Sequence, residues 1–120
     1  NKWPKFPPTS CMCFEKKTLK KALKQIEFKK YPTLAIDFRL AVYYSLILKS
    51  FYIHKSHLTF YRQVEESMDT KYVKYRSKEW WKRRKEAFEF LNYILKKNRL
   101  PINKGLDFHV TKLFNNILNI

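Results

Sequence analysis

This sequence has little glycine, little cysteine, few acidic residues and no long hydrophobic run. Gly105 is the only glycine among 120 residues, which excludes a phosphate site built on a glycine-rich loop. A membrane-spanning helix needs about 20 apolar residues. The best uncharged run, residues 40–48, has nine. The chain starts at Asn1 without a signal-like segment, so we expect a processed mature form or a trimmed chain.

The sequence also lacks the residue combinations that catalysis and metal binding require. We interpret His54, His57 and His109 as solvated histidines at helix ends. One residue separates Cys11 from Cys13, a spacing that strains a mutual disulfide, and no other His or Cys nearby would complete a metal site. We expect free or partner-linked thiols, no cofactor, no metal ion and no enzymatic activity.

Positive charge is the most prominent feature that is present. The chain has 26 basic and 10 acidic residues, a formal net charge of +16, whereas a small soluble domain usually carries a net charge of about 2–8. It is also 45% hydrophobic and 18% aromatic, which excludes a disordered basic tail. Because so much like charge opposes folding, we infer that it serves a polyanionic partner or an anionic membrane.

The spacing of the apolar residues predicts an all-α, single-domain protein. We expect an extended N-terminal arm over residues 1–14 and a five-helix up-and-down bundle over residues 15–120. Thr33 and Ser77 are expected N-caps. The five helices are expected from about residue 15 to a stop at Pro32, then over residues 33–54, 57–68, 77–97 and 107–118, with approximate ends.

The second expected helix is apolar on nearly every side. A helix of this kind lies at the centre of a bundle or faces an apolar partner. We therefore expect it at the centre of the domain. The substitution Leu46→Asp should then unfold the protein, because an unpaired buried carboxylate is costly.

Cations concentrate between Lys71 and Lys85, where aromatic residues separate them. Aromatic side chains of this kind suit membrane interfaces and base stacking. For the cations together we favour a binding surface over a solvated helix face. For Trp80 or Trp81 taken singly we favour a core position. The candidate binding residues are Lys71, Tyr72, Lys74, Tyr75, Arg76, Lys78, Trp80, Trp81, Lys82, Arg83 and Lys85.

Arg84 lies on the apolar stripe of the same expected helix, between Trp80 and Phe88. Its guanidinium is expected either to reach solvent along its aliphatic stem or to pair with a buried acid. Asp37, enclosed in the apolar second helix, is the suggested partner.

Several short motifs, in order along the chain, resemble the abalone sperm lysin family of small, basic, five-helix acrosomal proteins. They are Trp3-Pro4-Lys5-Phe6 in the arm, Lys21-Ala22-Leu23-Lys24, Thr33-Leu34, the aromatic segment 86–91, and the basic segment 95–100 that runs into Pro101. The resemblance implies a non-enzymatic protein that is stored in the sperm acrosomal granule and secreted at the acrosome reaction.

The family has two roles. Lysin opens the egg vitelline envelope without cleavage by binding its glycoprotein filaments, and a fusagenic paralogue is thought to mediate fusion of sperm and egg membranes. Here Lys outnumbers Arg twenty to six, whereas the basic tracks of lysin are rich in Arg. The second helix is more apolar than in lysin, and the pair Cys11 and Cys13 is not expected there. These departures favour the fusagenic paralogue.

Three functions therefore remain to be compared. The leading hypothesis is a fusagenic sperm protein, monomeric or weakly dimeric, that binds an anionic lipid membrane peripherally and inserts aromatic residues from the stretch 72–81 or from a partly opened second helix. The first alternative is a lysin-like binder of an egg-surface or egg-coat glycoprotein that dissolves the envelope. The second is a helical nucleic-acid-binding domain, against which the absence of zinc-finger, RNP and KH signatures argues.

Overall fold

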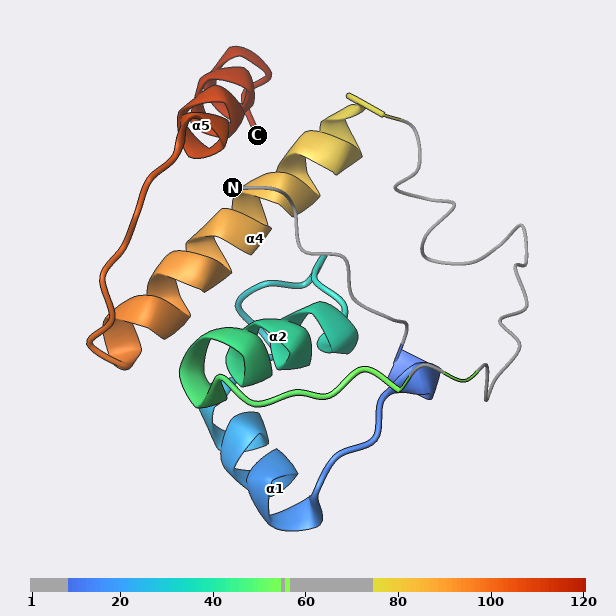
Figure 1. Cartoon of the computed structure of the whole chain (residues 1–120). Helices are drawn as coiled ribbons and strands as arrows, with labels where there is room; N and C mark the ends of the chain where they lie inside the picture. Colours follow the sequence, from blue (N-terminus) through green and yellow to red (C-terminus); the bar gives the residue numbers. More distant parts are fainter. Residues whose placement is uncertain (1–8, 55, 57–74) are drawn as a thin grey trace.

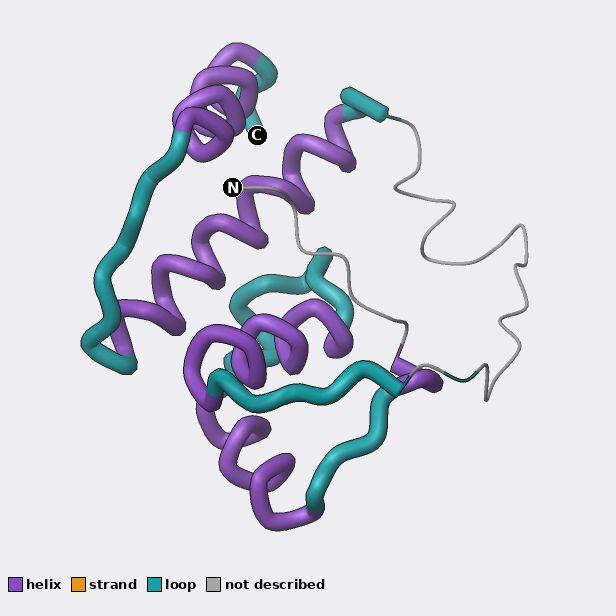
Figure 2. The backbone as a smooth tube through the Cα atoms, viewed as in Figure 1, coloured by secondary structure: helices purple, strands orange, loops and turns teal. Residues whose placement is uncertain are grey.

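A computed structural model of the chain describes residues 9–54, 56 and 75–120, and these residues are helical with no strand (Figures 1 and 2). The expected all-α class is confirmed. The described helices are the 3₁₀ turn η1 (Thr9–Cys11), α1 (Lys16–Gln25), α2 (Ile36–Val42), the π-helical segment η2 (Tyr43–Leu48), α4 (Lys78–Lys97) and α5 (Leu106–Ile117). The helix expected over residues 57–68, and residues 1–8 of the expected arm, lie outside the described residues.

Helix α1 ends earlier than the sequence suggests. The helix was expected to reach Pro32. Its last backbone hydrogen bond instead joins the Ile26 N–H to the Ala22 carbonyl, and the Ile26 backbone is already extended. A turn over residues 28–30 follows. The buried guanidinium of Arg39 holds the segment that follows α1, because it binds the backbone carbonyls of Glu27, Tyr31 and Leu34.

The sequence predicted that Thr33 caps the second helix, but in the structure it does not. Helix α2 begins after Ala35, which makes no side-chain cap bond. The Thr33 backbone N–H and hydroxyl instead both donate to Oε2 of Glu86, at 2.8 and 2.7 Å. This contact spans 53 residues and ties the turn before α2 to α4.

The second helix also stops short of the expected residue 54. It continues through η2 and ends at Lys49, which adopts the left-handed conformation with φ 50°. Residues 50–54 are not helical, and Phe51, Tyr52 and Ile53 are 67%, 83% and 72% exposed. The expected extent of this helix was wrong at its C-terminal end.

The core lies between α2 and the C-terminal half of α4. Phe90 and Ile94 are fully buried there, and Phe90 packs edge-to-face on Tyr31 with ring centroids 5.6 Å apart. The ring centroid of Phe38 in α2 lies 6.3 Å from that of Phe90. The first half of the expected central helix is therefore buried in the core, whereas Leu46 is 37% exposed.

The core also encloses Arg39, which is 3% exposed. Burial lowers the pKa of this guanidinium, and the nearby Glu86 carboxylate opposes that shift. Burial has the opposite effect on the Tyr31 hydroxyl and raises its pKa, because there the charged form is the deprotonated one. Carbonyl oxygens accept from both terminal amino groups of this buried arginine, which offsets part of the cost of its burial, while its Nε is buried without a hydrogen-bond partner.

The two C-terminal helices form an antiparallel pair. Ser77 caps α4 as expected, since its hydroxyl accepts a hydrogen bond from the Trp80 N–H at 3.1 Å, and α4 ends at the expected Lys97. Helix α5 runs back along the N-terminal half of α4 (Figure 1). Its direction follows from two ring pairs, Phe88 with Phe108 and Trp81 with Phe114.

Candidate cationic and aromatic surface

The N-terminal half of α4 carries most of the described candidate binding residues. Lys78 and Lys82 are exposed, and Lys85 is half-buried with its Nζ donating to the backbone oxygen of Ile120 at 2.9 Å. Successive helical residues are about 100° apart, so these three lysines, at i, i+4 and i+7, share one face. We name them the α4 lysine face.

The other described cations of the cluster point elsewhere. Arg76 is exposed, has a positive φ of 67° and lies with its guanidinium 5.0 Å from the Tyr75 ring. Arg83 is half-buried on a different side of α4 from the lysines. The structure thus brings Lys78, Lys82 and Lys85 together and separates the arginines from them. Lys71, Tyr72 and Lys74 lie outside the described residues.

The three described aromatic candidates differ in exposure. Tyr75 is 66% exposed, Trp80 is half-buried against it with ring centroids 5.1 Å apart, and Trp81 is only 6% exposed. Trp81 stacks on Phe114 of α5 with centroids 4.4 Å apart and the ring planes 9° from parallel. This burial agrees with the core position favoured for Trp81, whereas Tyr75 remains available to a partner.

Arg84 pairs with α5 and not with Asp37. Its Nη2 forms an ion pair with Asp107, and its Nε donates to the Thr111 hydroxyl at 2.9 Å. The Asp37 carboxylate instead accepts from the Phe38 N–H at 2.6 Å, in the first turn of α2. The suggested partner was wrong because α5 packs on this part of α4 and places Asp107 beside Arg84.

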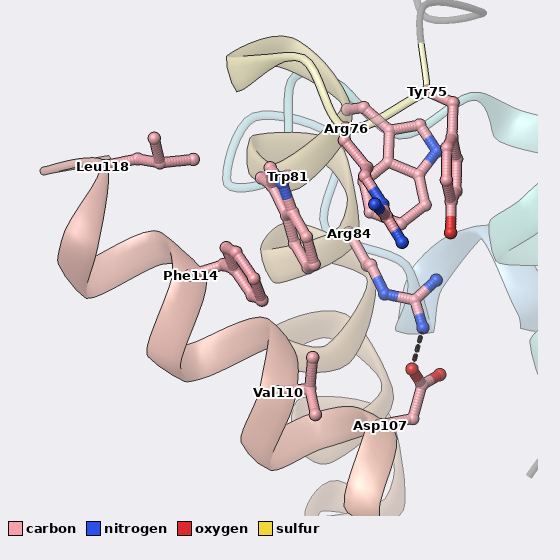
Figure 3. Close-up of a pocket in the computed structure, with 9 residues that line it drawn as sticks. Tyr75, Arg76, Trp81, Arg84, Asp107, Val110, Phe114 and Leu118 are labelled. Carbon is pink, nitrogen blue, oxygen red and sulfur yellow. Dashed lines mark ion pairs between the residues drawn. The ribbon is translucent and has the colours of Figure 1, made fainter.

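A cleft lies between the start of α4 and α5, with a volume of about 440 Å³. Figure 3 shows the Arg84–Asp107 ion pair on one side of it and the Trp81–Phe114 stack on another. Its walls are mostly aromatic and aliphatic, with two guanidinium groups. The lining residues of this aromatic–arginine cleft are Tyr75, Arg76, Trp80, Trp81, Arg84, Asp107, Val110, Phe114 and Leu118.

A second cationic surface lies on α1; the sequence pattern placed its lysines on the polar face of the first helix, but they were not among the candidate binding residues. Five of the ten residues of this helix are lysines, all five are exposed, and the helix contains no acidic residue. The signal was present in the sequence, because these lysines lie opposite the apolar positions that include Ala22. We name them the α1 lysine face: Lys16, Lys17, Lys20, Lys21 and Lys24.

The two lysine faces lie at different ends of the molecule. Figure 1 shows α1 and α5 on opposite sides of the body formed by α2 and α4. The α4 lysine face belongs to the half of α4 that packs on α5, as the contact between Lys85 and Ile120 shows. The protein can therefore present positive charge in two directions.

Within the described ranges, no group of three or more residues is arranged to hold a metal ion, and no helix is long and apolar enough to cross a membrane. Cys11 and Cys13 are exposed and form no disulfide. Comparison of the chain with protein-family models, with curated proteins and with solved structures gave no match.

Proposed function

We propose that this chain is a fusagenic acrosomal protein of the lysin family that binds anionic membranes, draws two of them together and promotes their fusion. The proposal includes the five-helix arrangement, of which the described residues contain α1, the α2–η2 helix, α4 and α5. It also includes secretion from the sperm acrosomal granule and the absence of an enzymatic step. The residues that support it are the two lysine faces.

The observation that carries the proposal is the exposure of lysines at two ends of one small protein. Each cation near an anionic bilayer contributes about 1 kcal/mol of attraction, so the five exposed lysines of α1 can hold a membrane surface by themselves. The exposed Lys78 and Lys82 of the α4 lysine face can hold a second surface. A protein with one such face binds a vesicle, whereas a protein with two also bridges vesicles.

Paired charge removals test this arrangement. We would measure binding to, and aggregation of, vesicles of phosphatidylcholine and phosphatidylserine, with pure phosphatidylcholine vesicles as the neutral comparison. The variant K17Q/K20Q weakens the α1 lysine face, and K78Q/K82Q weakens the α4 lysine face. The variant K49Q/K96Q removes the same charge from exposed lysines outside both faces.

Each face variant should aggregate anionic vesicles several-fold more slowly than the wild type, while K49Q/K96Q stays close to it. Single-vesicle binding should fall less than aggregation, because one intact face remains. Binding should also weaken steeply as salt shortens the Debye length from ~10 Å at 0.1 M to ~3 Å at 1 M. Equal losses in all three variants would show that net charge alone matters, and equal binding to neutral vesicles would contradict the proposal.

The aromatic–arginine cleft favours a second candidate function, lysin-like binding of an acidic egg-coat glycoprotein. This cleft of about 440 Å³ sets aromatic rings beside the guanidinium groups of Arg76 and Arg84. The exposed Arg76 could pair with an acidic group. Isolated egg envelopes provide the test: rapid dissolution that Tyr75→Ala and Arg76→Ala abolish, and that K78Q/K82Q leaves intact, would support this function over fusion.

A further inference from the structure

Helix α5 turns an aliphatic stripe largely away from α4, although one member of it, Val110, also lines the aromatic–arginine cleft. The stripe consists of aliphatic residues at i, i+4, i+7 and i+11, which follow one line along a helix. Their exposed fractions are 82%, 36%, 57% and 64% in order along the chain. We name this set the α5 ridge: Leu106, Val110, Leu113 and Ile117.

The opposite face of α5, which packs on α4, buries two polar residues beside the ring contacts of Phe108 and Phe114. Thr111 and Asn115 are each 2% exposed. Asn115 donates from Nδ2 to the Thr111 carbonyl at 2.6 Å, but its Oδ1 is buried without a hydrogen-bond partner. An amphipathic helix on a globular protein normally buries its aliphatic side, whereas α5 buries Thr111 and Asn115 and leaves its aliphatic line exposed.

Specific contacts hold the helix in this orientation. Arg84 reaches both Asp107 and Thr111, and Phe114 stacks on Trp81 (Figure 3). Rotating α5 to bury the ridge would break the ion pair and the stack together. The ridge is therefore presented to the outside by the α4–α5 contact itself.

The charges around the ridge indicate what covers it. Asp107 is the only acidic residue of α5, and its carboxylate is engaged by Arg84. The nearby Lys104 and Lys112 are exposed. An exposed aliphatic line on a protein with a formal net charge of +16 suits the headgroup region of an anionic bilayer. A second copy of the chain would instead bring like charges together.

We propose that α5 is the segment that enters the membrane, lying in the plane of the interface with the α5 ridge in the lipid. This inference rests on the proposed membrane function and names the element that perturbs the bilayer. The ridge extends over about 16 Å of helix axis, and an interfacial helix buries its apolar side about 5–10 Å into the headgroup and acyl boundary. Insertion on one leaflet adds area there and so favours fusion after adhesion.

The first test measures retention on phosphatidylserine-containing vesicles after transfer to about 1 M salt, where the Debye length is only ~3 Å. The variant L113Q/I117Q should lose at least about tenfold in salt-resistant retention. Burial of the Leu113 and Ile117 side chains in the lipid does not depend on charge, so its loss removes the part of the binding that survives high salt. Its binding at low salt should change little. The control F51Q/I53Q removes two exposed apolar residues from another segment and should behave like the wild type.

A second measurement locates the helix directly. In a C11S/C13S background, a fluorophore sensitive to polarity is attached to Leu113→Cys or, about 100° round the same helix, to Lys112→Cys. The label at residue 113 should shift to shorter wavelength on vesicle binding and be quenched by lipid-borne nitroxide. The label at residue 112 should respond much less.

Several outcomes would overturn the inference, and they separate it from the proposed function. If the wild type binds and bridges vesicles but L113Q/I117Q keeps full salt-resistant retention, the ridge does not insert and the proposed function stands. If F51Q/I53Q loses as much as L113Q/I117Q, the effect is not specific to α5. If L113Q/I117Q converts a dimer to a monomer in sedimentation, a second copy covers the ridge. If the wild type binds no vesicle, both proposals fail.

Discussion

The two halves of α4 pack in opposite ways. In the C-terminal half, Phe90 and Ile94 are fully buried in an aromatic core. In the N-terminal half, Arg84 and Trp81 contact α5 through an ion pair, a hydrogen bond and one ring stack. The core side excludes water from apolar groups, while the α5 side leaves a line of aliphatic residues in contact with it.

This contrast shows how one helix can serve both stability and surface function. Most of the free energy of folding should come from the core side, because apolar burial is its main source. The α5 side is free to expose apolar and cationic groups that a core could not hold. Substitutions on the two sides of α4 should therefore affect different properties.

The largest expected effect compares the same substitution on the two sides. Phe90→Ala should lower the free energy of unfolding by about 3–5 kcal/mol, because it leaves a cavity between Tyr31 and Phe38. Phe114→Ala should lower it by only about 1 kcal/mol, because Phe114 is 40% exposed and loses mainly its stack on Trp81. Urea denaturation measures both. Equal losses would remove the distinction between the two sides.

The next effect concerns the buried arginine. Arg39→Met should lower the free energy of unfolding by about 2–4 kcal/mol, because three backbone carbonyls lose their donor in the interior. Arg39→Lys should recover part of this loss, since one ammonium cannot reproduce a two-pronged guanidinium. Chemical denaturation of the two variants checks the order. If Met is tolerated as well as Arg, the turn after α1 does not depend on this residue.

The smallest expected change in stability is that of Leu46→Asp, for which the structure revises the prediction made from the sequence. Leu46→Asp was expected to unfold the domain, but Leu46 is 37% exposed at the end of the second helix. A carboxylate there can reach water, so the loss should be about 1 kcal/mol or less. Thermal melting of this variant should be cooperative and close to that of the wild type. Complete unfolding would show that this segment belongs to the core side after all.

Local patterns were enough to predict α4. Ser77 is a good cap, the following residues favour a helix, and Pro101 follows its end, so both expected bounds agree with the structure. The cation cluster could also be found from the sequence, because it needs only composition. Helix geometry showed which cations share a face, but only once the bounds of α4 were known.

Contacts between distant residues decided what local patterns could not. The loss of Thr33 as a cap, and the choice of Asp107 over Asp37 by Arg84, depend on Glu86 and on α5. The end of the second helix depends on a left-handed residue at Lys49, which no glycine or proline signals. Periodicity showed that α5 has an apolar stripe, but not that this stripe faces outward.

The most direct test of the account is lipid mixing between anionic vesicles, followed by the dilution of a fluorescent lipid pair. The wild-type protein should mix the lipids of phosphatidylserine-containing vesicles and leave pure phosphatidylcholine vesicles unmixed. Mixing should decline as the salt concentration is raised toward about 1 M. No mixing at any ratio of protein to lipid, or equal mixing of neutral and anionic vesicles, would contradict the account.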